Sequence, residues 1–316
     1  MLLPILSLLA GFILLMWSAD TFTDNGAKIA RIFNISPLVI GLLIFGFGTS
    51  APEMLVSGLA AYDGHPEMSI GNAFGSNIFN IGLVLGVTAI ILPITVEKSV
   101  LKKEWLFLFL STLIVGFLLL DGFLSFTDGL ILISLLTLFL INVFRESKKN
   151  NLTDSDNDND SFENNLQKND KGRTWLLLIV SLIILVSSAR LVVWGGTSLA
   201  LSFGVSDLII GLTVVALGTS LPELAVSISS ALKKQHQMVI GNIIGSNLFN
   251  TLGVLAIPGL ILPFQIPTEV MSRDFFFMLM FTLLVLILSM RLKISRFGGF
   301  ILLTALTIYL YQLFWI

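Results

Sequence analysis

The chain has 316 residues, of which 55% are hydrophobic and only 12% are charged, and its mean hydropathy is +0.94. These values exclude an ordinary soluble domain, and apolar runs long enough to cross a bilayer recur along the sequence. The net charge of −2 gives no indication of a nucleic-acid partner, and none is expected. The absence of cysteine excludes disulfides, thiolate metal sites and cysteine nucleophiles.

Ten apolar segments have the length of membrane-spanning helices. They cover residues 2–20, 37–60, 70–93, 104–121, 125–144, 174–197, 207–231, 240–263, 274–291 and 297–315. The first segment lacks a positively charged start and a small-residue cleavage site, so we expect a membrane helix there and not a signal peptide. The predicted fold class is an all-α integral membrane protein.

Two motifs occur twice, 170 residues apart. GFGTSAPE, which ends at Glu53, recurs as ALGTSLPE, which ends at Glu223, and GNAFGSNIFN recurs as GNIIGSNLFN. Five spans separate equivalent positions, and this odd number makes the two copies run in opposite directions through the membrane. We therefore predict two inverted five-helix repeats. The repeats cover 1–144, with motif segments 41–57 and 71–80, and 174–316, with motif segments 211–227 and 241–250.

Lysine and arginine residues lie almost entirely in the connections on one side of the predicted membrane. The other side has only Arg273, and Arg190 lies within the sixth span. Because cytoplasmic connections carry such an excess of basic residues, we expect a multi-pass plasma-membrane protein with both termini outside. The polar segment 145–173 is then cytoplasmic, and its acidic composition predicts a disordered linker between the repeats.

Each copy of the first motif places one carboxylate in an apolar span. Such a group costs from about 3 to well over 10 kcal/mol in the membrane and is by default functional. Thr49, Glu53 and Ser57 follow the spacing of one helix face, and Pro52 leaves carbonyl groups one turn upstream without their helical donors. The second copy repeats this pattern around Glu223, so each half offers a row of oxygen ligands.

The second motif adds a polar stripe to an otherwise apolar helix. The stripe consists of Asn72, Ser76 and Asn80 in the first copy and of Asn242, Ser246 and Asn250 in the second. Alone, each stripe would indicate hydrogen bonds between neighbouring helices. The glutamate in each copy favours a role in ligand binding instead.

The two copies together supply carboxylate, hydroxyl, amide and carbonyl oxygens, with no nitrogen or sulfur ligand. Such a set selects hard cations, and Ca²⁺, which takes 6–8 oxygens in flexible geometry, fits it better than Mg²⁺. Without a cation two close carboxylates repel, so Na⁺ or H⁺ could compete for the same oxygens. This competition predicts secondary active antiport.

Two other functions stay open at this point. The first is a passive cation channel, which the inverted symmetry disfavours because channel filters are usually rings around a symmetry axis. The second is an intramembrane enzyme that uses the two carboxylates as acid and base, which the symmetric hydroxyl and amide stripes do not suggest. We therefore expect a transporter and not an enzyme.

G-T-S-x-P-E followed by G-N-x-x-G-S-N, present in both halves, resembles the calcium/cation antiporter superfamily, in particular its prokaryotic sodium/calcium exchanger-like branch. The resemblance covers nearly the whole chain. It implies four central helices around the ions and Ca²⁺ extrusion in exchange for Na⁺ by alternating access. The expected partners are Ca²⁺, Na⁺ and the lipid bilayer, with no cofactor beyond the transported ions, and we expect a functional monomer.

By the same resemblance, Glu53 and Glu223 are the principal Ca²⁺ ligands. The resemblance also implies hydroxyl, amide or carbonyl ligands for Na⁺ and Ca²⁺ at Thr49, Ser50, Thr219, Ser220, Ser76, Ser246, Asn80, Asn250, Gly46 and Ala216. One position departs from the pattern, because well-studied sodium-coupled members carry Asp where this chain has Asn250. The exchanged ion therefore stays open between Na⁺, H⁺ and K⁺-assisted transport.

Two charged residues occupy equivalent positions in the first and sixth spans, which in the resembling family slide over the central bundle. They are Asp20 and Arg190. Snorkelling of the charged group toward the membrane surface explains both, and a gating contact is the alternative.

Overall fold

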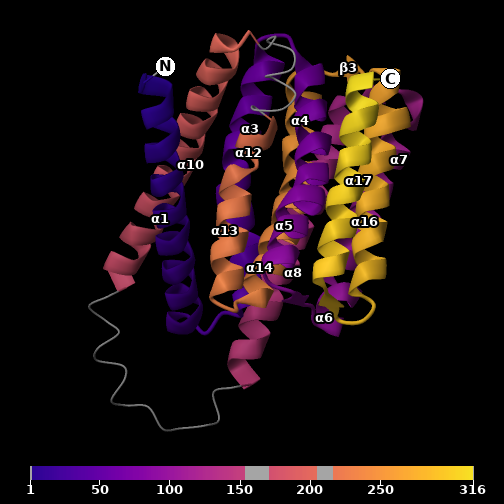
Figure 1. Cartoon of the computed structure of the whole chain (residues 1–316). Helices are drawn as coiled ribbons and strands as arrows, with labels where there is room; N and C mark the ends of the chain where they lie inside the picture. The colour runs from indigo at the N-terminus through magenta and orange to yellow at the C-terminus, as the bar shows by residue number, and fades with distance from the viewer. Residues whose placement is uncertain (1, 154–170, 205–215, 316) are drawn as a thin grey trace, which may run out of the picture.

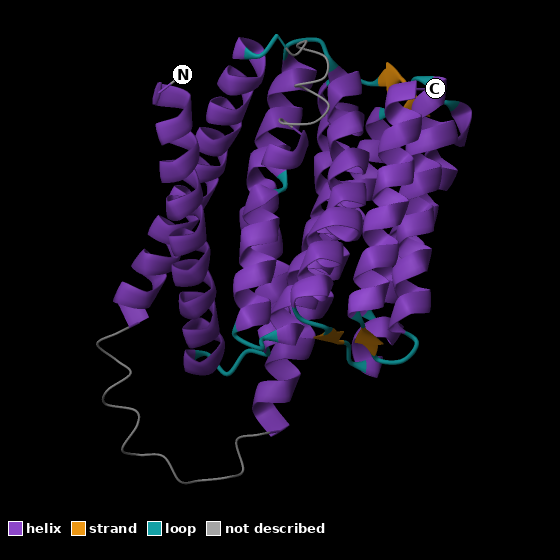
Figure 2. Cartoon of the chain, viewed as in Figure 1, coloured by secondary structure: helices purple, strands orange, loops and turns teal. Residues whose placement is uncertain are grey.

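The structure is a computed structural model that describes residues 2–153, 171–204 and 216–315. Most of these residues are helical, and the helices cross the molecule side by side with short connections at its two ends (Figures 1 and 2). Within the described residues, nine helices are long and apolar enough to cross a membrane. The shorter α13 (Leu221–Leu232) continues the predicted seventh span, whose residues 207–215 lie outside the described residues. The all-α membrane architecture is confirmed.

The first half begins at α1 and ends with α8. Its elements are α1 (Leu2–Ile32), α2 (Pro37–Ile40), η1 (Gly41–Phe45), α3 (Gly46–Tyr62), α4 (Pro66–Phe79), η2 (Asn80–Leu85), α5 (Gly86–Ile91), β1 (Ile94–Thr95), α6 (Lys98–Lys102), α7 (Glu104–Leu118), η3 (Leu119–Asp121), β2 (Phe123–Leu124) and α8 (Phe126–Thr153). Short helices join end to end into longer spans, so that α2, η1 and α3 make one span and α4, η2 and α5 the next.

The second half repeats this order in the residues that the structure describes. Its elements are α10 (Lys171–Ser202), α12 (Ala216–Thr219), α13, α14 (His236–Leu248), η5 (Phe249–Val254), α15 (Ala256–Ile261), β3 (Phe264–Gln265), η6 (Val270–Phe275), α16 (Phe276–Ser289), β4 (Lys293–Ile294) and α17 (Arg296–Trp315). Here α14, η5 and α15 form one continuous span.

Two predicted boundaries are wrong. Helix α1 continues to Ile32 and not to residue 20, because its polar second part packs against α13. Helix α8 continues to Thr153, so residues 145–153 are helical and the predicted linker begins later. The remainder of that segment, 154–170, lies outside the described residues.

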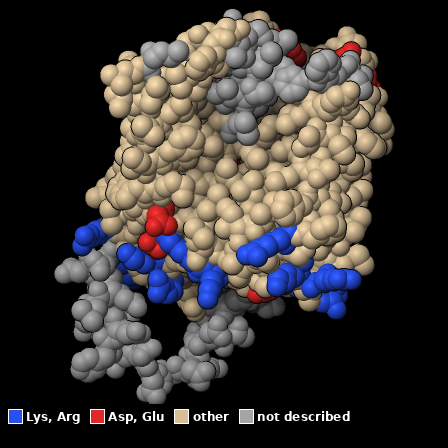
Figure 3. Space-filling model, viewed as in Figure 1, with Lys and Arg blue, Asp and Glu red and all other residues tan. Residues whose placement is uncertain are grey.

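The two ends of the bundle differ in charge. The chain termini lie at one end, and the ends of α8 and α10 that flank residues 154–170 lie at the other (Figure 1). Lysine and arginine side chains gather along this second end (Figure 3), which we call the basic end. Its described basic residues come from the ends of α1, α8, α10, α13 and α16, from α6, and from the residues around β4.

Three turns of π-helix interrupt the spans that carry the motifs. The η1 turn directly precedes Gly46, η2 begins at Asn80, and η5 contains Asn250. A π turn inserts a residue into the helix and is frequent at functional sites. The sequence prediction assumed regular helical spacing and missed all three turns.

Two short antiparallel strand pairs connect the halves. Strand β1 pairs with β4, with Ile94 opposite Ile294, and β2 pairs with β3, with Leu124 opposite Phe264. Each pair takes one strand from each half, and the two pairs lie at opposite ends of the bundle (Figure 2).

Helices α1 and α10 pack against each other beside the rest of the bundle (Figure 1). Their buried apolar residues, such as Phe22 and Leu185, form a cluster with Phe45 of η1. A larger apolar cluster joins α4, α5, α7, α8 and α14–α17. The motif-bearing helices contribute buried residues to both clusters.

The two halves approach most closely where glycine faces glycine. A Cβ atom added to Gly41 would lie 2.6 Å from the Met238 carbonyl oxygen and 2.9 Å from the Gly241 Cα atom. A Cβ atom on Gly46 would lie 2.8 Å from the Gly245 backbone. The obstructing atoms are backbone and cannot swing aside, so glycine is required for this crossing of η1–α3 with α14.

We expect Gly41→Ala to lower the free energy of unfolding by about 1–3 kcal/mol, because the added methyl group overpacks this crossing. The control is Gly58→Ala in the same span, where the added Cβ would meet only Ile257, at 3.6 Å. Thermal unfolding in detergent should show a lower midpoint for Gly41→Ala alone. Equal midpoints for the two variants would contradict the close crossing.

Candidate cation site

The two repeated glutamates lie at the middle of the bundle with their carboxylates enclosed. Glu53 on α3 is 2% exposed and Glu223 on α13 is 1% exposed, and these two helices contact each other. None of the four carboxylate oxygens has a hydrogen-bond partner among the described residues. Burying ionised carboxylates without compensation costs several kcal/mol each, so this arrangement requires a bound cation or proton.

Other oxygen groups without partners among the described residues lie beside Glu53 or Glu223 in sequence, or on turns that contact the glutamate-bearing helices. The Ser50 and Ser220 hydroxyls and the side-chain amides of Asn80 and Asn250 are buried, and none of them is hydrogen-bonded within the described part of the chain. The η5 turn, which carries Asn250, contacts α3, and the η2 turn, which carries Asn80, contacts α13. Each asparagine therefore lies on a turn that packs against the glutamate-bearing helix of the other half.

The hydroxyls of Thr49 and Ser246 meet across the two halves. Their oxygens are 3.2 Å apart, and the Thr49 hydroxyl also donates to the Phe45 carbonyl at 2.9 Å. The corresponding residues of the other copies, Thr219 and Ser76, lie on α12 and α4, with Ser76 buried. The structure thus places the predicted hydroxyl ligands on the four helices that carry the repeated motifs.

The structure describes the surroundings of one of the two predicted carbonyl ligands, Gly46, but not those of the other, Ala216. Gly46 is buried against the Gly245 backbone at the crossing of the halves. Ala216 is the first residue of α12 and directly follows a stretch outside the described residues, so its surroundings stay a prediction.

The side-chain amides of Asn72 and Asn242 donate hydrogen bonds to the glutamate-bearing helices. The Asn72 amide donates to the Glu53 carbonyl at 3.2 Å and to the Ser57 hydroxyl at 3.0 Å. The Asn242 amide makes the same two bonds to Glu223 and to Ser227, at 3.3 and 3.0 Å. These bonds fix each glutamate-bearing helix to the next helix along the chain, and they orient the carboxylates indirectly.

The two copies of the first motif differ in backbone. Helix α3 runs through Pro52 without a break, whereas the second copy is interrupted between α12 and α13 at Ser220, with φ −90° and ψ 3°. In both copies proline lacks the amide that would bond the carbonyl four residues earlier, at Gly48 and Gly218. One side of the site is therefore a continuous helix, α3, and the other side is a helix that is interrupted at Ser220.

Asn77 and Asn247 are polar groups of the same region that the sequence prediction missed. Both are buried; the Asn77 amide donates to the Thr251 hydroxyl at 2.7 Å, and the Asn247 side chain has no partner among the described residues. Both belong to the repeated G-S-N triplet, and that repetition was the available signal. They lie off the helical stripe of Ser76 and Asn80, so regular helical spacing does not assign them to the site.

Access to Glu53 comes from the side of α10. A cavity of about 380 Å³ reaches Glu53 and Thr219 and is otherwise lined mainly by α10, including Arg190 and Trp194. This volume holds several water molecules, at about 30 Å³ each. Arg190 is exposed and lines this cavity beside the glutamate, which the sequence did not reveal.

The equivalent residue of α1 has a different environment. Asp20 forms an ion pair with Lys233 at 2.9 Å and accepts a hydrogen bond from the Ser229 hydroxyl at 2.7 Å. Lys233 also pairs with Asp24 at 2.9 Å. Helix α1 is thus bonded to the end of α13, whereas α10 leaves a cavity beside α3 and α12.

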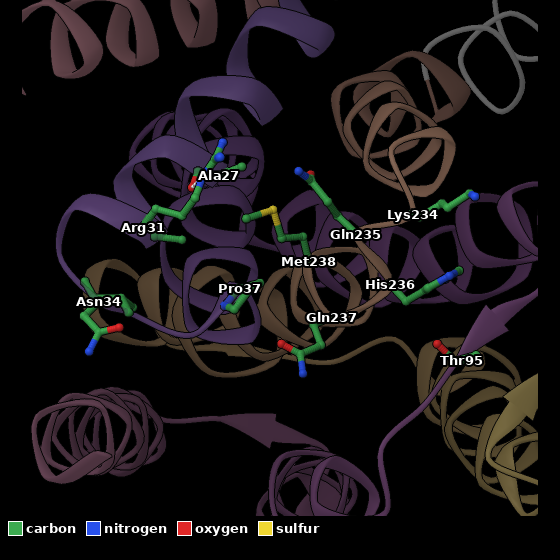
Figure 4. Close-up of a pocket in the computed structure, with 12 residues that line it drawn as sticks. Ala27, Arg31, Asn34, Pro37, Thr95, Lys234, Gln235, His236, Gln237 and Met238 are labelled. Carbon is green, nitrogen blue, oxygen red and sulfur yellow. Dashed lines mark hydrogen bonds between the residues drawn. The ribbon is translucent and has the colours of Figure 1, made fainter. Parts of the chain in front are cut away.

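A second cavity, of about 620 Å³, lies at the basic end and does not fit a cation. Figure 4 shows its residues, with Arg31 and Asn34 on one side, Lys234 and His236 on the other, and Met238 between them. Among the residues that the structure describes, no acidic side chain lines it, and two basic side chains do. This hollow is therefore not a candidate cation site.

Two inverted halves, each with one buried carboxylate and unpartnered oxygens, define a membrane transporter for cations. A family model described as "Sodium/calcium exchanger protein" matches residues 3–145 and again residues 173–315. The chain therefore belongs to the sodium/calcium exchanger family, and it is a cation antiporter of the calcium-transporting kind.

Similar proteins match over their full lengths. The inner membrane protein YrbG of Escherichia coli is 36% identical over 100% of this chain and 98% of its own. The sodium/calcium exchanger MaX1 of Methanosarcina acetivorans is 29% identical over 98% of each chain. A structure of the sodium-calcium exchanger NCX_Mj, soaked with zero Na⁺ and Ca²⁺, superimposes with a TM-score of 0.84 at 36% identity over 99% of both chains. These matches confirm the expected exchanger fold and family.

In cation-free buffer we expect Glu53→Gln to raise the thermal unfolding midpoint, because it removes an uncompensated buried charge. Ca²⁺ should stabilise the original protein, by about 2.7 kcal/mol at a concentration 100 times the Kd, and should not stabilise the variant. Glu67→Gln, at an exposed position of α4, is the control and should respond to Ca²⁺ like the original. Full Ca²⁺ stabilisation of Glu53→Gln would contradict the site.

Proposed function

We propose that the protein exchanges Ca²⁺ for Na⁺ across the plasma membrane and extrudes Ca²⁺ from the cytoplasm. The observation that carries the proposal is the pair of buried, unpartnered carboxylates of Glu53 and Glu223, one from each inverted half. Two negative charges match one Ca²⁺, and the oxygens around them are those of a hard-cation site. The names of MaX1 and NCX_Mj, both sodium/calcium exchangers, support the same ion pair.

Exchange follows from the cost of an empty site. When Ca²⁺ leaves, the carboxylates repel each other and lose their compensation, so the empty protein is disfavoured until Na⁺ occupies the oxygens. Thr49, Ser246 and the two site asparagines, Asn80 and Asn250, supply neutral oxygens that a monovalent cation can use as well. One site serves both ions in turn, and this competition couples their movements.

The difference between α1 and α10 supports alternating access. These helices are equivalent by the repeat, yet α1 is bonded to α13 through Asp20 and Lys233, and α10 borders the cavity that reaches Glu53. We propose that the two arrangements interchange during transport, so that the site opens beside α10 in one state and beside α1 in the other.

The basic end is the cytoplasmic end in this proposal. The support is the positive-inside rule, since the basic residues gather where α8 and α10 flank residues 154–170 (Figures 1 and 3). Both termini then face outward. The chain contains no cysteine, so single introduced cysteines report the side of the membrane without background.

We expect Lys98→Cys in intact cells to react only with membrane-permeant thiol reagents, because Lys98 is exposed at the basic end. His65→Cys, in the exposed turn between α3 and α4, should react with an impermeant reagent added outside. The opposite labelling pattern would reverse the proposed orientation.

In everted membrane vesicles loaded with Na⁺, we expect uptake of radioactive Ca²⁺ against its own gradient. Glu53→Gln and Glu223→Gln should each reduce this uptake at least about 10-fold, because each removes half of the charge that compensates Ca²⁺. Glu67→Gln is the control and should retain uptake. Undiminished uptake in either site variant would contradict the assignment, and a channel would not move Ca²⁺ uphill at all.

The exchanged ion is tested in proteoliposomes that contain Na⁺, K⁺ or H⁺ gradients one at a time. We expect the Na⁺ gradient alone to drive Ca²⁺ uptake, because the neutral hydroxyl and amide oxygens beside the glutamates can coordinate Na⁺ and would be of no use to a proton bound to a glutamate. Uptake driven by H⁺ alone would overturn the sodium proposal and leave the antiporter fold intact.

A further inference from the structure

A cavity at the basic end, away from the cation site, combines positive charge with an apolar wall. It measures about 960 Å³ and lies between the end of α16, strand β4 and the start of α17. Its lining includes the basic residues Arg291, Lys293 and Arg296 and the apolar residues Ile287, Met290 and Phe297. Its lining contains no acidic side chain from the described ranges 2–153, 171–204 and 216–315.

The three basic residues are exposed and uncompensated. None of them forms an ion pair with any acidic residue that the structure describes, and the Arg296 guanidinium donates only to the Ile91 carbonyl, at 3.4 Å. Guanidinium groups bind phosphate through paired hydrogen bonds. The cavity is therefore suited to an anion.

The apolar wall is as accessible as the charges. Ile287 is 62% exposed, Met290 76% and Phe297 74%. Ile287 and Phe297 lie on α16 and α17, which are apolar enough to cross the membrane, and Met290 directly follows α16. A free inorganic anion would gain nothing from these side chains, whereas an acyl chain would cover them. The fitting ligand is thus an anion with a hydrocarbon part.

The inverted repeat shows that the fold does not need these charges. At the positions 170 residues earlier, Asp121, Phe123 and Phe126 replace Arg291, Lys293 and Arg296 around the equivalent strand β2. The same scaffold therefore forms at the opposite end without any of the three basic residues.

The two halves also differ in charge at the start of the helix that follows the strand, which is α8 in the first half and α17 in the second. In α8 the Asp128 carboxylate accepts hydrogen bonds from the Ser125 amide at 2.8 Å and from its hydroxyl at 2.6 Å, so the helix start has its own anion. The equivalent residue of α17 is Gly298, which supplies no carboxylate. The Ser295 hydroxyl oxygen accepts from the Gly298 amide at 3.1 Å, and its proton stays available for a ligand. The positive end of α17 is thus left for an anion from outside the chain.

We propose that this cavity binds the phosphate headgroup of an anionic phospholipid in the leaflet at the basic end. Arg291, Lys293 and Arg296 hold the phosphate, with the Ser295 hydroxyl and the first amides of α17. The acyl chains lie along Ile287 and Phe297. The lipid site does not depend on which ions are exchanged, and only the naming of its leaflet as cytoplasmic rests on the proposed function.

The test is native mass spectrometry of the purified full-length protein with phosphatidylglycerol or phosphatidylcholine. A basic residue near an anionic lipid surface contributes a factor of about 5 in binding, so replacing all three should weaken phosphatidylglycerol binding about 100-fold. The variant is Arg291→Gln with Lys293→Gln and Arg296→Gln. The single change Arg296→Gln should weaken binding about 5-fold and serves if the triple variant does not fold.

The matched control removes three charges from the same end but outside the cavity, as Lys28→Gln with Lys98→Gln and Lys102→Gln, all at exposed positions. It should keep phosphatidylglycerol binding within about 2-fold of the original. Equal losses in both triple variants would show a general surface attraction and overturn the site. Equal retention of phosphatidylcholine and phosphatidylglycerol by the original protein would overturn it as well.

A last comparison separates lipid from free phosphate. Phe297→Ser should weaken the binding of phosphatidylglycerol but leave competition by inorganic phosphate unchanged, because only the lipid uses the apolar wall. If inorganic phosphate displaces phosphatidylglycerol at equal concentration, the cavity is a phosphate site and the lipid proposal fails. Ca²⁺ transport should persist in the triple variant in detergent-free liposomes of neutral lipid, so failure here is distinguishable from failure of the exchanger function.

Discussion

The rest of this structure depends on two enclosed carboxylates that no group in the described part of the chain neutralises. A chain folds around such charges only if its other interactions offset them and if an ion from outside completes the site. The two apolar clusters and the glycine crossing of η1–α3 with α14 supply the packing. The amide bonds from Asn72 and Asn242 then hold the helices that carry Glu53 and Glu223. The unfavourable charge is thereby kept where a cation can reach it.

The sequence predicted what repetition and chemistry can reveal. The inverted halves, the buried glutamates and the clustered basic residues all follow from residue identity and spacing, and they are present in the structure. It could not predict which members of a polar stripe face the site. Asn72 lies on the same stripe as Asn80, yet its amide bonds the neighbouring helix at Glu53 and Ser57, and such a partner depends on how two helices pack. Nor could spacing within one helix reveal the cavity that Arg190 lines, since that cavity depends on how α10 packs against another helix.

The two halves share a sequence pattern but not a conformation. The first copy keeps α3 intact through Pro52, and the second is interrupted at Ser220, although both contain the same proline. Similarly, Asp20 on α1 is ion-paired, and Arg190 on α10 borders a cavity. If the two halves were identical in conformation, the site would be equally open or equally closed at both ends, and no ion gradient could be coupled to another. The departure from symmetry is therefore as informative about function as the symmetry itself.

The two small strand pairs limit how the molecule can move. Strand β1 pairs with β4 and β2 with β3, so each pair ties one half to the other, at opposite ends of the bundle. Outside the ladders, the Val96 amide donates to the Leu292 carbonyl at 2.9 Å, and the Ile266 amide donates to the Gly122 carbonyl at 2.8 Å. If one half tilted against the other, the main-chain hydrogen bonds of the strand pair would stretch at the end of the bundle that opened. Helices α1 and α10 are not part of either strand pair and pack mainly on each other. They can therefore shift together along the remaining helices, which the two strand pairs hold together at both ends of the bundle.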